Sequence, residues 1–278
     1  METEVMKEQI ILDMIKEKRK IWKKGSGRNL LASIKPELEK HSISIGRDKF
    51  FDLLRENDLL IKKTKRKTNT TFSYHHFHKY PNLIKEIKAT YPGQIIVSDI
   101  TYIWLSENDS FAYLYLITDV YSRKIIGYYI SDNLKASSAV KALKKALKYL
   151  PRIKAIIHHS DRGIQYCSYE YTDLLKLNNI SISMTEDSDP RDNAIAERIN
   201  RTIKEEFTDD KTISFKNLNQ AKNNIPKIIN FYNEQRPHRS IEMLTPDVAF
   251  TMNRELKRYW KSYYPQKITK GENEILVN

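Results

Sequence analysis

The order of strand-like and helix-like segments after residue 94 restricts this chain to a mixed α/β fold. Three runs rich in β-branched and aromatic residues follow one another across short polar turns, which is the pattern of antiparallel strands. Two shorter apolar runs come later, and amphipathic helical segments separate and follow them. The order therefore predicts a mixed five-stranded sheet with flanking helices. The expected strands are 94–105, 111–120, 124–131, 154–161 and 180–186, and the expected helices are 137–150, 168–179 and 192–207.

The first 60 residues have helical spacing instead, with Met6, Ile10 and Met14 on one side of the first segment. Two further short helices are expected on either side of the turn-prone sequence SISIG. A helix-turn-helix that binds DNA fits this arrangement, and so does an ordinary small helical bundle with solvated charges.

The basic charge lies at the two ends of the chain. The net charge is +13, with 19 basic and 11 acidic side chains in residues 1–80, 17 and 18 in 81–210, and 12 and 6 in 211–278. Such a distribution suits a polyanion such as nucleic acid, although an anionic membrane or an acidic protein remains open on charge alone. The basic, Thr/Asn-rich stretch near 62–80 is expected to be a linker or an arm. Its Lys65 and Arg66 either lie along a phosphate backbone or belong to a solvated linker.

Several classes of protein are excluded or disfavoured by composition. A single cysteine, Cys167, permits no internal disulfide and no cysteine-based zinc site. The acidic start METEVMKEQ is unlike a secretory signal, and no long apolar run follows it. We expect a cytoplasmic protein with no membrane partner.

Two aspartates stand where carboxylates are uncommon. Asp99 lies inside the first apolar run, and Asp161 ends the fourth, directly before Arg162 and Gly163. A carboxylate beside a sheet costs several kcal/mol unless a cation compensates it. Each is a candidate functional acid, although an aspartate at a strand end also caps turns.

A third candidate acid follows from helix geometry. At 100° per residue, Ile195, Ile199, Ile203 and Phe207 form one stripe, and Asn193, Glu197, Arg201 and Lys204 lie on the opposite side. Glu197 approaches Asp99 and Asp161 if that polar side covers the sheet. The alternative is a solvated face on which Glu197 and Arg201 form an i,i+4 pair.

Three converging carboxylates suit divalent metal ions. Hard cations such as Mg²⁺ take oxygen ligands, and two ions held about 3.5–4 Å apart activate the attacking oxygen and stabilise the leaving oxygen of a phosphodiester. The acids of the middle segment would then bind the metal ions, and the basic residues at the two ends of the chain would bind the polyanion.

The motifs that carry these acids resemble a known family. VSDITYI, HHSDRGIQY and DPRDNAIAERINRTIKEEF are similar to the Asp-Asp-Glu motifs of insertion-sequence transposases of the second-frame type, which carry a retroviral-integrase-like catalytic core. The 35 residues between Asp161 and Glu197 match the spacing of that family, and residues 232–250 are similar to its carboxy-terminal signature.

The resemblance implies a ribonuclease-H-like fold and a chemistry. Asp99, Asp161 and Glu197 would bind two Mg²⁺ or Mn²⁺ ions while the enzyme cuts double-stranded DNA at element ends and joins the 3′-hydroxyl to target DNA. It also implies a homo-oligomer on DNA, associated with the bacterial nucleoid, and a possible upstream-frame partner. The expected domains are a helical DNA-binding domain (1–61), a basic linker (62–90), the ribonuclease-H-like core (91–212) and a basic carboxy-terminal helical extension (213–278).

Other residues are weighed beside this triad. Lys204 stands seven positions after Glu197, where the family carries a basic residue that contacts DNA, and we expect the same of Arg201. Arg236 and Arg239 either bind phosphate or fix the closing helix against the core. His159 and Asn193 are expected to orient the metal-binding carboxylates.

The chain departs from the family at two places, with Ile96 and Ser188 where relatives often carry Trp and Gly. Neither change removes a metal ligand. Two other functions remain open: a DNA-binding regulator or domesticated remnant without catalysis, and a simple metal-dependent nuclease without strand transfer.

Overall fold

A single mixed sheet lies at the centre of the computed structural model, which describes residues 2–61, 76–85, 87–151, 155–186, 193–208 and 215–257. The strand order is β3-β2-β1-β4-β5. β1 and β3 both pair antiparallel with β2, whereas β1, β4 and β5 run parallel. The predicted five-stranded ribonuclease-H-like sheet is therefore confirmed. The strands are β1 (Ile95–Leu105), β2 (Ser110–Asp119), β3 (Ile125–Ser131), β4 (Ile156–Ser160) and β5 (Ile180–Met184).

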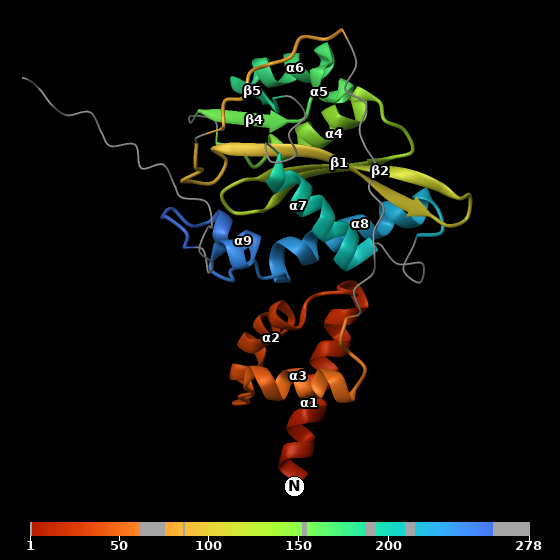
Figure 1. The fold of residues 1–278 in the computed structure, drawn as a ribbon, viewed down its shortest axis with the longest axis vertical. Coiled ribbons are helices and arrows are strands. Elements are labelled where there is room, and N and C mark those ends of the chain that lie inside the picture. Colours follow the sequence, from red (N-terminus) through yellow and green to blue (C-terminus); the bar gives the residue numbers. More distant parts are fainter. Residues whose placement is uncertain are drawn as a thin grey trace, which may run out of the picture.

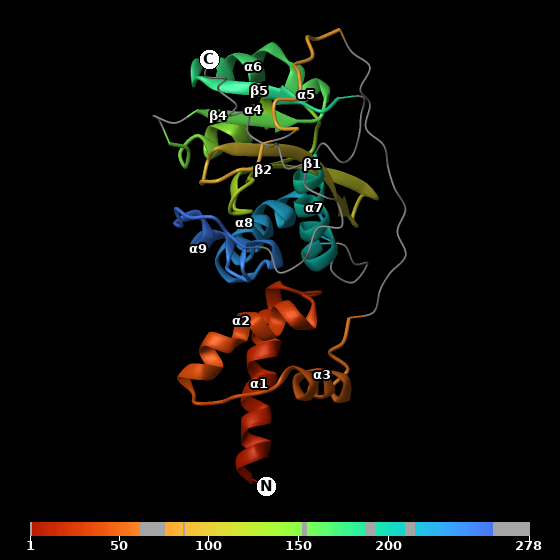
Figure 2. The same cartoon turned by 60° about the vertical axis from the view of Figure 1, so that its left-hand side comes forward.

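Helices cover both faces of this sheet (Figures 1 and 2). One face packs against α4 (Ala136–Ala146), α5 (Ile164–Cys167) and α6 (Tyr169–Leu177), and the other against α7 (Ala194–Ile203) and α8 (Leu218–Gln235). A short α9 (Pro246–Phe250) follows α8. Each face has its own apolar core, because strand residues alternate between the two sides.

The alternation along β1 decides which side Asp99 faces. Ile96 is buried in the core beneath α4–α6, whereas Ile103 and Leu105 belong to the core that contains α7 and α8. Asp99 has the parity of Ile103, so its side chain lies on the α7 side of the sheet.

The amino-terminal region forms three helices, as the sequence predicts: α1 (Glu2–Ile21), α2 (Gly27–Lys40) and α3 (Arg47–Glu56). They lie together below the sheet, next to α7 and α8 (Figure 2). Trp22, directly after α1, is fully buried and stacks on Phe207 at 6.4 Å between ring centroids. The helical region is thus packed onto the sheet-containing part of the chain through an aromatic contact.

The helix that carries Glu197 is shorter than the sequence predicts. The apolar stripe Ile199, Ile203 and Phe207 is buried as expected, but the α-helix ends at Ile203 and continues as a π-helix, η1 (Lys204–Thr208). The backbone N–H of Lys24 donates to the Glu206 carbonyl at 3.0 Å. The π-helix therefore forms a hydrogen bond with the distant amino-terminal region. Because that partner is far away in the sequence, the spacing of residues along the helix does not predict the π-helix.

Candidate active site

Two parallel strands bring Asp99 and Asp161 together. Val97 pairs with His159 and Ser98 with Ser160 in the β1–β4 register. Asp99 and Asp161 each come directly after this last pair, one on each strand, and both are half-buried. Adjacent parallel strands lie about 4.8 Å apart, so the two carboxylates leave the sheet side by side and on the same face.

The helix α7 attaches to this point through two asparagines. Asn193 Nδ2 donates to the Ser98 carbonyl at 3.1 Å, and Asn200 Nδ2 donates to Asp99 Oδ2 at 2.8 Å. Asn193, Glu197 and Asn200 are spaced i, i+4 and i+7, which places them on one stripe of the helix. Glu197 therefore lies on the side of α7 that faces Asp99, with one anchored residue a turn before it and another a turn after it.

Electrostatics also indicates that the three acids are close. Burial raises the pKa of Asp99 to about 7, and the charges of Asp161 and Glu197 add to the rise, whereas hydrogen bonds from Ile100 N–H and Asn200 oppose it. The pKa of Glu197 is raised by partial burial of its carboxyl, lowered by Arg201 and raised by Asp161. Mutual repulsion of this kind is what a divalent cation would relieve.

A glycine fixes the carboxylate of Asp161. The backbone N–H of Gly163 donates to Asp161 Oδ1 at 3.0 Å. A Cβ atom at position 163 would lie 2.9 Å from the same oxygen. The close approach of backbone to carboxylate is thus possible only without a side chain there.

The donor set suits Mg²⁺ or Mn²⁺, because all three side chains offer carboxylate oxygens. Within the described residues no group of three His, Cys, Asp or Glu side chains is already gathered closely enough to hold an ion. Glu197 is exposed on α7, so its carboxylate is the ligand with the most freedom to move toward the other two.

The two histidines before Asp161 lie on opposite faces of the sheet. His158 is buried beneath α6, where its Nε2 lies 2.7 Å from Ser98 Oγ and 2.8 Å from the Tyr171 hydroxyl. Burial lowers the pKa of His158 to about 3, which keeps the ring neutral. His159 has the parity of Asp161 and lies, fully buried, with Nδ1 2.8 Å from Ser183 Oγ. His159 is therefore the histidine on the side of the acids.

Asn200 is a site residue that our sequence analysis missed. It hydrogen-bonds directly to Asp99 and is 6% exposed. The signal was present, because position 200 continues the stripe of Asn193 and Glu197 by one helical turn. An asparagine has no charge, and so it did not stand out beside Arg201 and Lys204.

Sequence comparison identifies relatives of this chain. The integrase core domain family matches residues 89–190, and a second integrase core domain family matches residues 178–246. An insertion element IS600 31 kDa protein of Shigella sonnei is 33% identical over 215 residues, which cover 77% of this chain and 78% of that protein. The transposase for insertion sequence element IS904 of Lactococcus lactis is 31% identical over 183 residues, 63% of this chain and 71% of that protein.

The chain belongs to the insertion-sequence transposases with an integrase core. This assignment confirms the family expected from the motifs around the three acids. The integrase catalytic core of HTLV-2, solved in complex with magnesium, is 16% identical to the transposase, with a TM-score of 0.42 over 57% of this chain and 97% of that one. A simian T-cell lymphotropic virus intasome chain is 14% identical, with a TM-score of 0.47 over 85% and 76%.

The described helices of the transposase include none that is both long and apolar enough to cross a membrane. The cations predicted to contact DNA lie in different settings. Arg201 and Arg239 are exposed and Lys204 is half-buried, whereas Lys65 and Arg66 lie outside the described residues. Arg201 and Lys204 extend from the helix that carries Glu197, and Arg239 begins a 3-10 turn, η2 (Arg239–Ile241).

Arg236 has a different position from the other predicted DNA contacts. It is 6% exposed, and its Nη2 and Nε donate to the two carboxylate oxygens of Glu206 at 2.6 and 2.8 Å. Its Nη1 lies 2.9 Å from His238 Nε2. We assign Arg236 a structural role, because the guanidinium is used inside the protein. This was one of the two alternatives for the carboxy-terminal signature.

Proposed function

We propose that this transposase cuts DNA at the ends of its element and joins the freed 3′-hydroxyl to target DNA, with Asp99, Asp161 and Glu197 as its catalytic carboxylates. One observation supports this most directly. The charges of Asp161 and Glu197 raise the pKa of Asp99 on β1, and the charge of Asp161 raises that of Glu197 on α7. A protein that did not bind a cation there would keep this repulsion with no gain.

The three carboxylates would hold Mg²⁺ or Mn²⁺, in a pair when DNA is bound. The ions would activate the attacking water or hydroxyl and stabilise the leaving oxygen. The chain's own residues prepare the site. Asn200 and the Ile100 N–H hold the Asp99 carboxylate, and Gly163 holds that of Asp161. Asn193 attaches α7 to β1, and His159 supports β4 beside Asp161.

DNA would lie across the carboxylates and the basic ends of the chain. Arg201 on α7 and Lys204 at the start of η1 follow Glu197 by one and two turns. Arg239, Lys65 and Arg66 add positive charge from other segments. The three amino-terminal helices would recognise the element end. We also propose that the active form is a homo-oligomer on DNA and that an upstream-frame protein assists it.

A strand-transfer assay tests this proposal. The full chain is incubated with a precut element end, target DNA and Mg²⁺ or Mn²⁺, and joined product is measured. Asp99→Asn, Asp161→Asn and Glu197→Gln should each reduce product by about 100-fold or more, because each removes a metal ligand. The matched controls Asp173→Asn and Glu170→Gln change exposed acids on α6 and should retain activity.

Folding and DNA binding of each variant are measured in parallel. Both should stay near wild-type levels, since only the metal ligands change. Strand transfer retained by any one of the three variants would refute the triad. Cleavage without joining would instead identify a simple nuclease, and DNA binding without either reaction would identify a regulator.

A further inference from the structure

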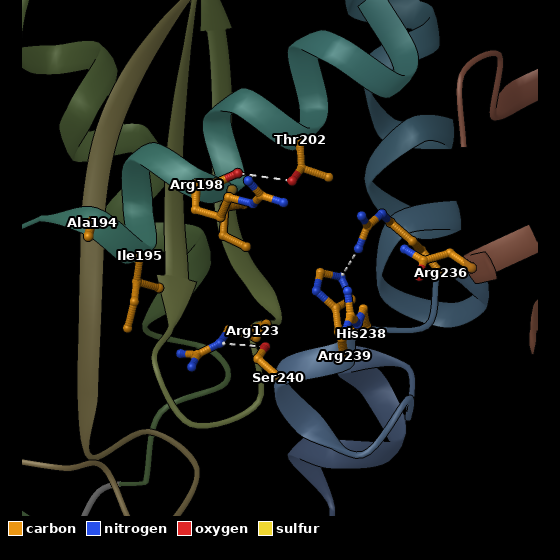
Figure 3. A pocket seen from close by; sticks show the side chains of 11 residues that line it. Arg123, Ala194, Ile195, Arg198, Thr202, Arg236, His238, Arg239 and Ser240 are labelled. Carbon is orange, nitrogen blue, oxygen red and sulfur yellow. Dashed lines mark hydrogen bonds between the residues drawn. The ribbon is translucent and has the colours of Figure 1, made fainter. Parts of the chain in front are cut away.

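A cavity of about 430 Å³ lies beside α7 (Figure 3). It lies along the stripe of Ile195, Ile199 and Thr202, which helical geometry places opposite Glu197. It is bordered by α7, by the segment around η2, by Arg123 and by the first turn of α2. Side chains from α7 and from residues 236–240 face one another across it (Figure 3). Its volume is in the range of small-molecule sites, about 300–1,000 Å³.

The lining of this cavity is strongly basic. Arg123, Arg198, Arg236 and Arg239 all contribute, and none of the described residues that line it is Asp or Glu. Glu206, which lies outside the lining, compensates Arg236. Arg198 and Arg239 are exposed and form no ion pair within the described part of the chain. Positive charge therefore remains available to a ligand.

The pKa of the buried His238 indicates that the arginines of the cavity lie close together. His238 is 7% exposed, and its pKa is held well below its usual value by burial and by the charges of Arg236, Arg123 and Arg198. Because Arg236 Nη1 donates to His238 Nε2, that nitrogen must be the unprotonated one. The histidine is thus neutral and leaves the positive charge of the cavity to the arginines.

Polar groups at the cavity add hydrogen-bonding capacity. Arg123 is held by Ser240, whose Oγ accepts from Nε at 3.3 Å, and by the Val120 carbonyl. Asn29, on α2, is 7% exposed and lines the cavity, and its Oδ1 accepts no hydrogen bond within the described residues. A rotation of this amide exchanges its oxygen and nitrogen, so Asn29 is able to donate to a bound oxygen.

The cavity is separate from the carboxylates. Ile195, Ile199 and Thr202 line it and form one stripe of α7, whereas Asn193, Glu197 and Asn200 form another. A group held in the cavity is therefore kept apart from the three acids by the body of the helix. It cannot be the reacting phosphodiester.

We propose that this arginine cavity is a second, non-catalytic site that binds a phosphate group through Arg198, Arg239 and Arg123. Guanidinium groups bind phosphate oxygens through paired, charge-assisted hydrogen bonds, and several of them around one concavity can contact a single phosphate group. The expected source is a backbone phosphate of the DNA, an assignment that rests on the proposed function. A free phosphate ester shares the same chemistry.

The test uses the full chain without divalent metal, so that it does not depend on catalysis. Binding of inorganic phosphate is measured by calorimetry for the wild-type protein, for Arg198→Gln and Arg239→Gln, and for the double variant. Both residues are exposed, so the substitutions leave the core unchanged. Lys144→Gln changes an exposed lysine of α4 at the opposite face of the sheet, removes the same charge and is the matched control.

The expected result is saturable phosphate binding that weakens about tenfold in each single variant and further in the double variant. The Lys144→Gln control should stay within about twofold of wild type, since it removes only a remote charge. Absence of saturable binding by the wild-type protein, or an equal effect of the control, would overturn the proposal.

A second arm identifies the source of the phosphate. Affinity for double-stranded DNA is measured as a function of salt, and loss of one phosphate contact should reduce the slope of log K against log salt by about 0.9. A reduced slope in Arg198→Gln supports the DNA backbone as the ligand. An unchanged slope with weakened phosphate binding overturns the DNA assignment and identifies a free phosphate ester. Failure of strand transfer by the triad variants affects neither arm.

Discussion

Glu206 joins three parts of the fold, and its replacement by glutamine should destabilise the protein strongly. Its carboxylate accepts two hydrogen bonds from Arg236 and a third from Trp22 Nε1 at 2.6 Å. The side chains of Arg236 and Glu206 are 7% and 15% exposed. Glutamine keeps one oxygen as an acceptor but presents an NH₂ group to a donor.

The magnitude follows from burial of the pair. Removal of one partner of a buried ion pair costs about 3–5 kcal/mol, because the other charge stays buried without compensation. Domains are stable by about 5–15 kcal/mol, so the loss is a large share of the total. At about 2–4 °C per kcal/mol for chains of this size, the unfolding midpoint should fall by about 10 °C.

Thermal and urea unfolding of the full chain provide the measurement. The neighbouring exposed Glu205→Gln is the control and should cost about 0–1 kcal/mol. The double variant Glu206→Leu with Arg236→Met should be more stable than the sum of its single variants predicts, by about 2 kcal/mol or more, since both charges leave together. A loss below about 1 kcal/mol for Glu206→Gln, or additive single effects, would refute the buried pair as a coupled unit.

Four further predictions concern the carboxylates. In the metal-free protein Asp99 holds a proton up to about pH 7, well above its ordinary value of 3.8, so its contribution to the free energy of unfolding should decrease as pH rises through that range. Mn²⁺ affinity measured by calorimetry should increase up to about pH 7 and then level off, because the proton on Asp99 competes with the ion, and an affinity independent of pH would contradict this. Gly163→Ala should displace the Asp161 carboxylate and reduce strand transfer at temperatures where the variant is still folded. Loss of strand transfer only where the variant unfolds would contradict this reading. Asn200→Ala should weaken Mn²⁺ binding by about 10–100-fold through loss of its bond to Asp99, so unchanged Mn²⁺ affinity would count against it.

The sheet and the proximity of the three candidate acids could be predicted because their signals are local. Runs of β-branched and aromatic residues predict β1 and β2. Asp99 and Asp161 are recognised because a carboxylate inside or at the end of an apolar run is uncommon. The helical period then shows which side of α7 carries Glu197. Each of these predictions uses only residues that are close together in the sequence, within one strand or a few turns of one helix.

The remaining features depend on contacts between distant segments. The π-helix at Lys204–Thr208 meets the backbone of Lys24, and Arg236 is buried because Glu206 lies opposite it. Neither partner is visible from spacing along one helix. The same holds for the arginine cavity, since Arg123, Arg198 and Arg239 come from three segments that only the folded chain brings together.

The packing of Trp22 on η1 has a consequence for movement within the protein. Glu197 and Glu206 belong to one uninterrupted helical stretch, and the indole of Trp22 is stacked on Phe207 and bonded to Glu206. A displacement of α1 would therefore act on the helical stretch that carries Glu197. Tension that DNA exerted on the amino-terminal helices would reach the proposed active site through the Trp22 indole and the backbone bond from Lys24 to Glu206.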